Sequence, residues 1–174
     1  MKVPPEDRPS TVTVLIGPTP LRIRAIEPTD TAALQAMHHG LSEATVYRRF
    51  FAALPELALV QAERFTHVDG RRRAALVAED PDGDLVAVGR YDVIDDEGRT
   101  AEVAFVVADA FQHKGLGTTL VRLIASLARA AGIEVLVADV LSNNTAMHHA
   151  FRDAGLTPRA SYEAGVAHLE MPLA

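Results

Sequence analysis

The chain has 174 residues, of which 48% are hydrophobic and 23% are charged, and its formal net charge is −6 at pH 7. This length suits one domain with a single large core, and the composition is that of a folded globular protein. The negative charge disfavours contact with a phosphate backbone, so we expect no nucleic-acid partner. The absence of cysteine excludes disulfides, zinc–thiolate sites and a thiol nucleophile.

Residues 1–11 are polar and rich in proline, which predicts a flexible N-terminal tail. They lack the apolar segment of a secretory signal. No apolar run approaches the roughly 20 residues that span a bilayer. We therefore expect a cytoplasmic protein without a membrane partner, in which residues 12–174 form a single domain.

The first half of the domain predicts a hairpin followed by three helices. The expected segments are strands at Val12–Ile16 and Leu21–Ile26, a helix capped at Thr29 or Asp30 with apolar residues recurring to Leu41, a short helix capped by Ser42, and a third helix with Pro55 at its first position that continues to Phe65.

The second half predicts three antiparallel strands, then helix, strand, helix and a final strand pair. The expected segments are Arg73–Glu79, Leu85–Ile94, Thr100–Val107, helix Gly115–Ala131, strand Glu134–Val140, helix Asn144–Ala154, and strands Ser161–Glu163 and Val166–Met171. This order indicates an α/β protein with a mixed, mostly antiparallel sheet flanked by helices on both faces. The step from residue 100 to residue 140 is the expected parallel crossover.

A glycine-containing stretch, Gln112-His113-Lys114-Gly115-Leu116-Gly117, lies between a strand and the longest amphipathic helix pattern. Free N–H groups at a helix start can bind an anion, and glycines let a pyrophosphate approach the backbone. A plain turn with a charged rim is the alternative reading. The Walker pattern and the dinucleotide-binding G-x-G-x-x-G pattern are both absent.

The stretch resembles the Q-x-x-G-x-G motif of the GCN5-related N-acetyltransferases (GNAT), which bind acetyl-CoA through it. The next helix is similar to a second motif of this family, through Asn144, Met147, Phe151, Gly155 and Leu156. The segments "LRIRAIEPTD", "LSEATVYRRFF" and "EVAFVVADAFQHKGLG" resemble the bacterial Pat-type enzymes, which acetylate protein lysines. The resemblance covers about residues 20–172 and implies the GNAT fold.

Glu102 is the one charged residue in an otherwise apolar strand, and alternation places it on the same face as Ala104 and Val106. It is either a strand-end carboxylate facing water or a partly desolvated general base. Amine attack on a thioester needs such a base. A glutamate at this position has that role in Pat-type enzymes, so the resemblance favours the base.

The resemblance also implies a set of residues that bind acetyl-CoA, the expected co-substrate. The backbone of Phe105, Val106 and Val107 would hold the pantetheine arm. Asn143 and Asn144 would border this arm, and they also suit the cap of the following helix. The pyrophosphate would lie on a loop formed by Gln112, His113, Lys114, Gly115, Leu116, Gly117 and Thr118, where Lys114 adds a charge.

The expected activity is direct acetyl transfer from acetyl-CoA to an amine, most simply a protein lysine, by a monomer or homodimer. A small-molecule amine acetyltransferase and a non-catalytic acyl-CoA-binding module are the alternatives. The second is kept open by Phe151, which stands where many relatives have a tyrosine that protonates the CoA thiolate.

The remaining polar residues predict no further site. The adjacent pairs His38–His39 and His148–His149 point to different sides of a helix, so we expect no metal. Arg48 and Arg49 are interpreted as a solvated helix face. The aromatic residues at positions 47, 50 and 51 are interpreted as core and cleft wall.

Overall fold

The computed structural model describes residues 11–174, so most of the expected tail, residues 1–11, lies outside the described residues. The described part forms one eight-stranded sheet in the order β1-β2-β3-β4-β5-β6-β8-β7. The strands are β1 Val12–Ile16, β2 Thr19–Ala25, β3 Arg73–Glu79, β4 Leu85–Val93, β5 Thr100–Val107, β6 Val135–Leu141, β7 Arg159–Glu163 and β8 Val166–Pro172. The β5–β6 pair is parallel and the other six are antiparallel, as the sequence predicts.

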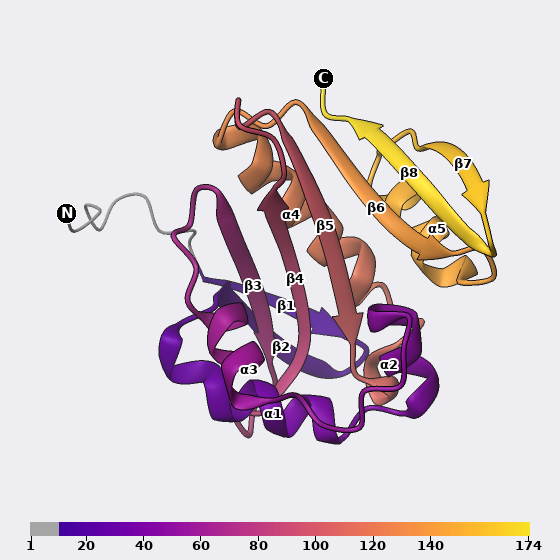
Figure 1. The fold of residues 1–174 in the computed structure, drawn as a ribbon. Coiled ribbons are helices and arrows are strands. Elements are labelled where there is room, and N and C mark those ends of the chain that lie inside the picture. Colours follow the sequence, from indigo (N-terminus) through magenta and orange to yellow (C-terminus); the bar gives the residue numbers. More distant parts are fainter. Residues whose placement is uncertain (1–10) are drawn as a thin grey trace.

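Helices cover both faces of this sheet (Figure 1). The α-helices are α1 Thr31–His39, α2 Glu43–Phe50, α3 Leu59–Thr66, α4 Leu116–Ala130 and α5 Thr145–Asp153, and short 3-10 turns lie at Pro28–Asp30 and Asp109–Phe111. Helix α4 packs on β3, β4 and β5 and also contacts α5. Helices α1 and α2 lie against β4 and β5, and α3 packs on α1. The expected mixed α/β fold with two helical layers is confirmed.

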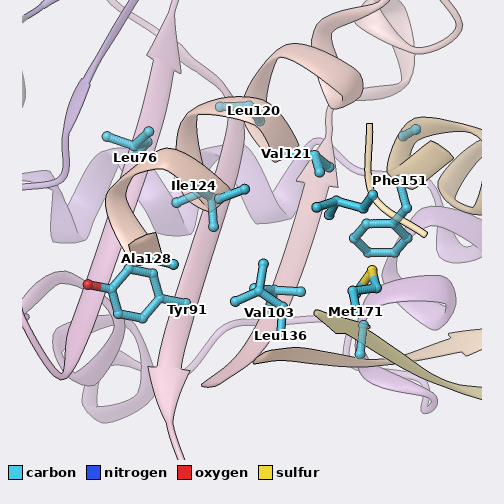
Figure 2. Packing of buried hydrophobic residues seen from close by; sticks show 14 of the residues in the cluster. Leu76, Tyr91, Val103, Leu120, Val121, Ile124, Ala128, Leu136, Phe151 and Met171 are labelled. Atoms are coloured by element: carbon cyan, nitrogen blue, oxygen red, sulfur yellow. The ribbon is translucent and has the colours of Figure 1, made fainter. Parts of the chain in front are cut away.

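The larger core lies between the sheet and α4. Leu120, Ile124 and Ala128 recur at helical spacing along α4 and are fully buried. They pack in one cluster with Val103 of β5 and Leu136 of β6 (Figure 2). This packing fixes the side-chain alternation of β5, because Val103 points toward α4 and its neighbours Glu102 and Ala104 must point to the opposite face.

A smaller core lies on that opposite face, under α1 and α3. It contains Leu34, Met37 and Ala62 of the helices and Val77 and Val88 of the sheet, with Val106 packed against it. The face of β5 that carries Glu102, Ala104 and Val106 is therefore the face that α1, α2 and α3 partly cover.

The third helix begins later than the sequence predicts. It starts at Leu59 after Ala58, and Pro55 lies in an irregular segment before it. Tertiary contacts hold this segment, since Nε2 of Gln35 donates to the Leu57 carbonyl at 2.9 Å and Nε2 of His38 lies 2.7 Å from the Leu54 carbonyl. The carbonyl groups of this segment are therefore held by side chains of α1 instead of by a helix of their own.

Candidate active site

The parallel strands β5 and β6 pair over only three positions. Thr100, Ala101 and Glu102 pair with Val135, Leu136 and Val137. Beyond these positions both strands continue, β5 to Val107 and β6 to Leu141, but they diverge (Figure 1). The edge of β5 that faces β6 is therefore unpaired in the described chain from Val103 onward, although β4 still pairs with its other edge.

A cleft of about 700 Å³ lies where the strands diverge. Its walls come from five elements: β5, β6, the start of α4, α5 and the end of α2. Eleven of the thirteen predicted site residues line it, namely Glu102, Phe105, Val106, Val107, Gln112, His113, Gly115, Gly117, Thr118, Asn143 and Asn144.

The start of α4 forms one end of this cleft. Gly115 is the residue before the helix and has φ +87°, and His113 also lies in the left-handed region with φ +59°. Within residues 11–174, no acceptor is found for the backbone N–H groups of Leu116, Gly117 and Thr118. These open N–H groups and the positive end of the helix dipole make the cleft suited to an anion such as a pyrophosphate.

Two predicted residues, Lys114 and Leu116, do not line the cleft. The Lys114 side chain is exposed, and its Nζ donates to the Ala110 carbonyl at 2.9 Å. The Leu116 side chain is only 1% exposed and belongs to the larger core. Leu116 can therefore serve an anion only through its backbone N–H, and the expected position of the Lys114 charge in the cleft is not seen.

A polar network that the sequence analysis missed joins the loop before α4 to α2. One carboxylate oxygen of Asp109 accepts from the Ser42 hydroxyl at 2.6 Å and from the Thr45 hydroxyl at 2.9 Å, while the other accepts from the Ser42 backbone N–H at 3.0 Å. Nε2 of Gln112 donates to Thr45 and to the Val107 carbonyl. The side chain of Gln112 is thus an anchor for the loop.

The hydrogen bonds to Asp109 also set its charge. Partial burial raises the pKa of Asp109, but the hydrogen bonds from Ser42 and Thr45 outweigh this effect and hold the pKa below its ordinary value. The carboxylate is therefore ionised at neutral pH and fixes the start of α2 to the loop. The only sequence signal for this network was the prediction that Ser42 caps a helix. The structure confirms that prediction, because the Ser42 hydroxyl accepts from the Thr45 N–H.

Glu102 lies at the point where the strands separate and lines the cleft. Its side chain is exposed, so the expected partial desolvation is not seen in this structure. Its carboxylate is close enough to Arg49 of α2 for the two charges to interact. An accessible carboxylate at this point can exchange protons with a molecule in the cleft, directly or through water.

Arg49 does not lie on a solvated helix face, and that interpretation is wrong. Its side chain is half-buried and lines the cleft. Its guanidinium carbon lies 4.7 Å from the ring centroid of Phe50 and 5.9 Å from that of Phe65. Sequence periodicity missed this, because the apolar rings that hold Arg49 come partly from α3, which is distant in sequence.

Phe151 borders the same cleft but is 1% exposed. Its ring meets that of Phe105 edge to face with centroids 5.9 Å apart, and it packs in the larger core (Figure 2). Phe151 thus closes the wall of the cleft without offering a proton. Asn144, as expected, caps α5, because its side-chain oxygen accepts from the Met147 N–H at 3.2 Å.

Residues 11–174 contain no cluster of three or more His, Asp or Glu side chains that could hold a metal ion. In the same range, no helix has the length and apolar character needed to cross a membrane.

The diverging strands and the open helix start define the architecture of an N-acetyltransferase that uses acetyl-CoA. Residues 34–156 match the acetyltransferase (GNAT) family, and the chain belongs to this family. It is an acetyltransferase, and acetyl-CoA, the donor of this family, is its co-substrate.

Two solved structures and one curated relative illustrate the similarity. The GNAT domain of S. lividans PAT is 36% identical, with a TM-score of 0.86, over 98% of this chain and 99% of that chain. The structure of yncA from Salmonella typhimurium with acetyl-CoA is 21% identical, with a TM-score of 0.71, over 88% of this chain and 94% of that one. An acetyltransferase of Pseudomonas aeruginosa is 29% identical over 134 residues, which are 75% of this chain and 69% of the relative.

Proposed function

We propose that this acetyltransferase modifies the side-chain amine of lysine in a protein, with Glu102 as the general base. The observation that carries the proposal is the position of Glu102, at the last paired position of β5 before the cleft opens. The similarity to the GNAT domain of S. lividans PAT supports the Pat-type branch that the sequence motifs indicate.

The unpaired edge of β5 can bind acetyl-CoA, the donor of the acetyl group. Backbone groups of Phe105 and Val106 on this edge can hold the pantetheine arm in the manner of an added strand, which leaves the pyrophosphate near the start of α4. A backbone N–H on this edge can also polarise the thioester carbonyl as charge develops on its oxygen. The side chains of Asn143 and Asn144 lie on the facing wall.

The reaction needs a neutral amine, because a lysine ammonium has no lone pair. Glu102 accepts a proton from the ammonium, directly or through water. The neutral nitrogen then attacks the thioester carbonyl and gives its second proton to water. The C–N bond forms, the C–S bond breaks, and the CoA thiolate leaves. Since Phe151 has no proton to give, the thiolate takes one from water, and Glu102 later returns its proton to solvent.

The test is a thiol-release assay with acetyl-CoA and lysine peptides, followed by mass spectrometry to place the acetyl group. Thiol release with Nε-acetylation, lost in Glu102→Gln, is the expected result. Thiol release only with polyamines or aminoglycosides would mean that the acceptor is a small amine and not a protein lysine. Binding of CoA without thiol release for any amine would indicate a non-catalytic acyl-CoA-binding module.

A further inference from the structure

Arg49 is a cation in the cleft whose charge the described part of the chain does not pair. Its side chain forms no hydrogen bond or ion pair within residues 11–174. Glu102 and Asp92 are the two carboxylates that interact with its charge, and Asp92 already binds two other arginines. Nε of Arg73 lies 2.8 Å and Nε of Arg90 lies 3.0 Å from its two oxygens.

The Glu102 and Asp92 carboxylates act on Arg49 from a distance, but neither forms an ion pair with it. Burial, and then the nearby guanidinium of Arg90, lower the pKa of Arg49 to about 10. Arg49 still carries its charge at neutral pH. The Arg49 residue lines both the main cleft and a smaller, mostly apolar cavity between α1, α2 and the sheet.

The cleft has charges of opposite sign on its facing walls. Arg49 belongs to α2, whereas Asp139 of β6 lines the cleft from the other strand and contacts His168 of β8 at 2.5 Å. Glu102 lines the same cleft where the strands begin to separate, and its charge interacts with that of Arg49. When the amine of an acceptor lies at Glu102, Arg49 is nearby and can bind an anionic group on the same acceptor.

We propose that Arg49 binds a carboxylate of the acceptor, close to the amine that is acetylated. In a protein acceptor this carboxylate is an Asp or Glu side chain near the modified lysine. The inference rests on the proposed function and narrows its substrate class to lysines with acidic neighbours.

The geometry and the surroundings of the Arg49 guanidinium favour binding of a carboxylate. A guanidinium presents a planar fork that pairs with both oxygens of a carboxylate. Stacking against the Phe50 and Phe65 rings already restricts its rotamers, so little further entropy is lost on binding. An incoming carboxylate would also form a direct ion pair with Arg49, which no carboxylate of residues 11–174 does.

The test compares two capped peptides that differ at one position next to lysine, which is Asp in one and Asn in the other. We expect wild-type kcat/KM to be about tenfold or more higher for the Asp peptide, as a charge-assisted pair implies. Arg49→Gln should remove this preference, and Arg49→Lys should keep part of it. Arg64→Gln removes the same charge from the exposed surface of α3, outside the cleft, and should leave the preference intact.

A second pair of acceptors separates this inference from the proposed function. Nα-acetyl-lysine and N-acetylcadaverine carry the same amine and differ only in a carboxylate. Peptides could fail to react while Nα-acetyl-lysine reacts better than N-acetylcadaverine, and only when Arg49 is present. In that case the inference holds, and the proposal that the acceptor is a protein is wrong. If peptides react equally well with Asp or Asn, the proposed function stands and the inference is overturned.

Two further outcomes would overturn the inference. Arg49→Gln could lower the rate of both peptides by the same factor, which would mean that Arg49 acts through Glu102 or the donor. Alternatively, succinyl-CoA could be a better donor than acetyl-CoA only when Arg49 is present. That result would place the bound carboxylate on the acyl group instead of the acceptor.

Discussion

Glu102 and Val137 are the last residues at which β5 and β6 pair. One position further, Val103 still packs in the core under α4, while the edge of the strand beside it faces the cleft. The candidate base and the unpaired backbone that suits the donor are therefore neighbours on one strand. This arrangement requires no flexible loop to bring them together.

Acetyl-CoA should stabilise the folded protein, because a ligand that binds only the folded state adds its binding free energy to the free energy of unfolding. At a concentration of 100 Kd the gain is about 2.7 kcal/mol, which for a domain of this size corresponds to roughly 5–10 °C in Tm. Differential scanning fluorimetry with and without acetyl-CoA measures it. An unchanged Tm at millimolar acetyl-CoA would contradict the binding site at the start of α4.

Gly117→Asp should weaken CoA binding while the domain stays folded. A side chain at Gly117 has room, since its Cβ would meet only the Cβ of Ala150 at 4.0 Å. Gly117 is the second residue of α4, so replacing this glycine should not destabilise the helix, and a carboxylate in the first turn is favourable. The same carboxylate, however, repels a pyrophosphate at the open N–H groups.

The matched control is Gly117→Ala, which adds the Cβ without the charge. We expect isothermal titration calorimetry to show a larger loss of CoA affinity for Asp than for Ala, with both variants at least as resistant to heat as the wild type. Equal CoA affinity in all three proteins would mean that the loop is a plain turn.

Local patterns predicted most of the fold because they record which face of each element is buried. Strand Thr100–Val107 was predicted with both of its ends, because a mostly apolar run is bounded by a polar turn before it and by the glycine-containing stretch after it. Helix α4 was predicted from its continuous apolar face. The third helix was misplaced because Pro55 fits a helix start, whereas contacts from α1 hold that segment in an irregular conformation.

Most of the donor site was predictable and the acceptor side was not. The loop at Gln112–Gly117 is a continuous motif, and its glycines mark the place where backbone is exposed. By contrast, Arg49 and Asp109 gain their roles from residues far along the chain. Asp109 binds Ser42, 67 residues away, and Arg49 stacks on Phe65 of another helix. Spacing within one segment carries no signal for such contacts.

Asp109→Asn should loosen the attachment of α2 to the loop before α4. At neutral pH the substitution removes the charge from three hydrogen bonds, and because the site is exposed we expect a loss of roughly 1 kcal/mol in the free energy of unfolding. Urea unfolding at pH 7 measures it. Ser42→Ala removes one of the partners of Asp109, and the double variant Ser42→Ala/Asp109→Asn should cost less than the two single changes added together, because both residues belong to the same network.

The same substitution should change how stability depends on pH. The pKa of Asp109 is lower in the folded protein than its ordinary value of 3.8, so its contribution is complete above that ordinary value and is lost as pH falls through the lowered pKa. The difference between wild type and Asp109→Asn should therefore shrink in acid. A constant difference between pH 7 and pH 3 would show that the charge of Asp109 contributes nothing.

Glu102→Gln should lower kcat/KM by at least about 10²-fold, because general-base catalysis is commonly worth 10²–10⁴-fold and an amide cannot accept the amine proton. The substitution keeps the shape of a side chain that is exposed in the cleft, so Tm should change little. Steady-state kinetics with an identified acceptor, together with CoA affinity by calorimetry, test this. A Glu102→Asp variant, with a shorter carboxylate, should recover part of the rate. If Glu102→Gln keeps nearly full activity, the base lies elsewhere or water suffices, and if CoA affinity falls together with the rate, Glu102 has a structural role.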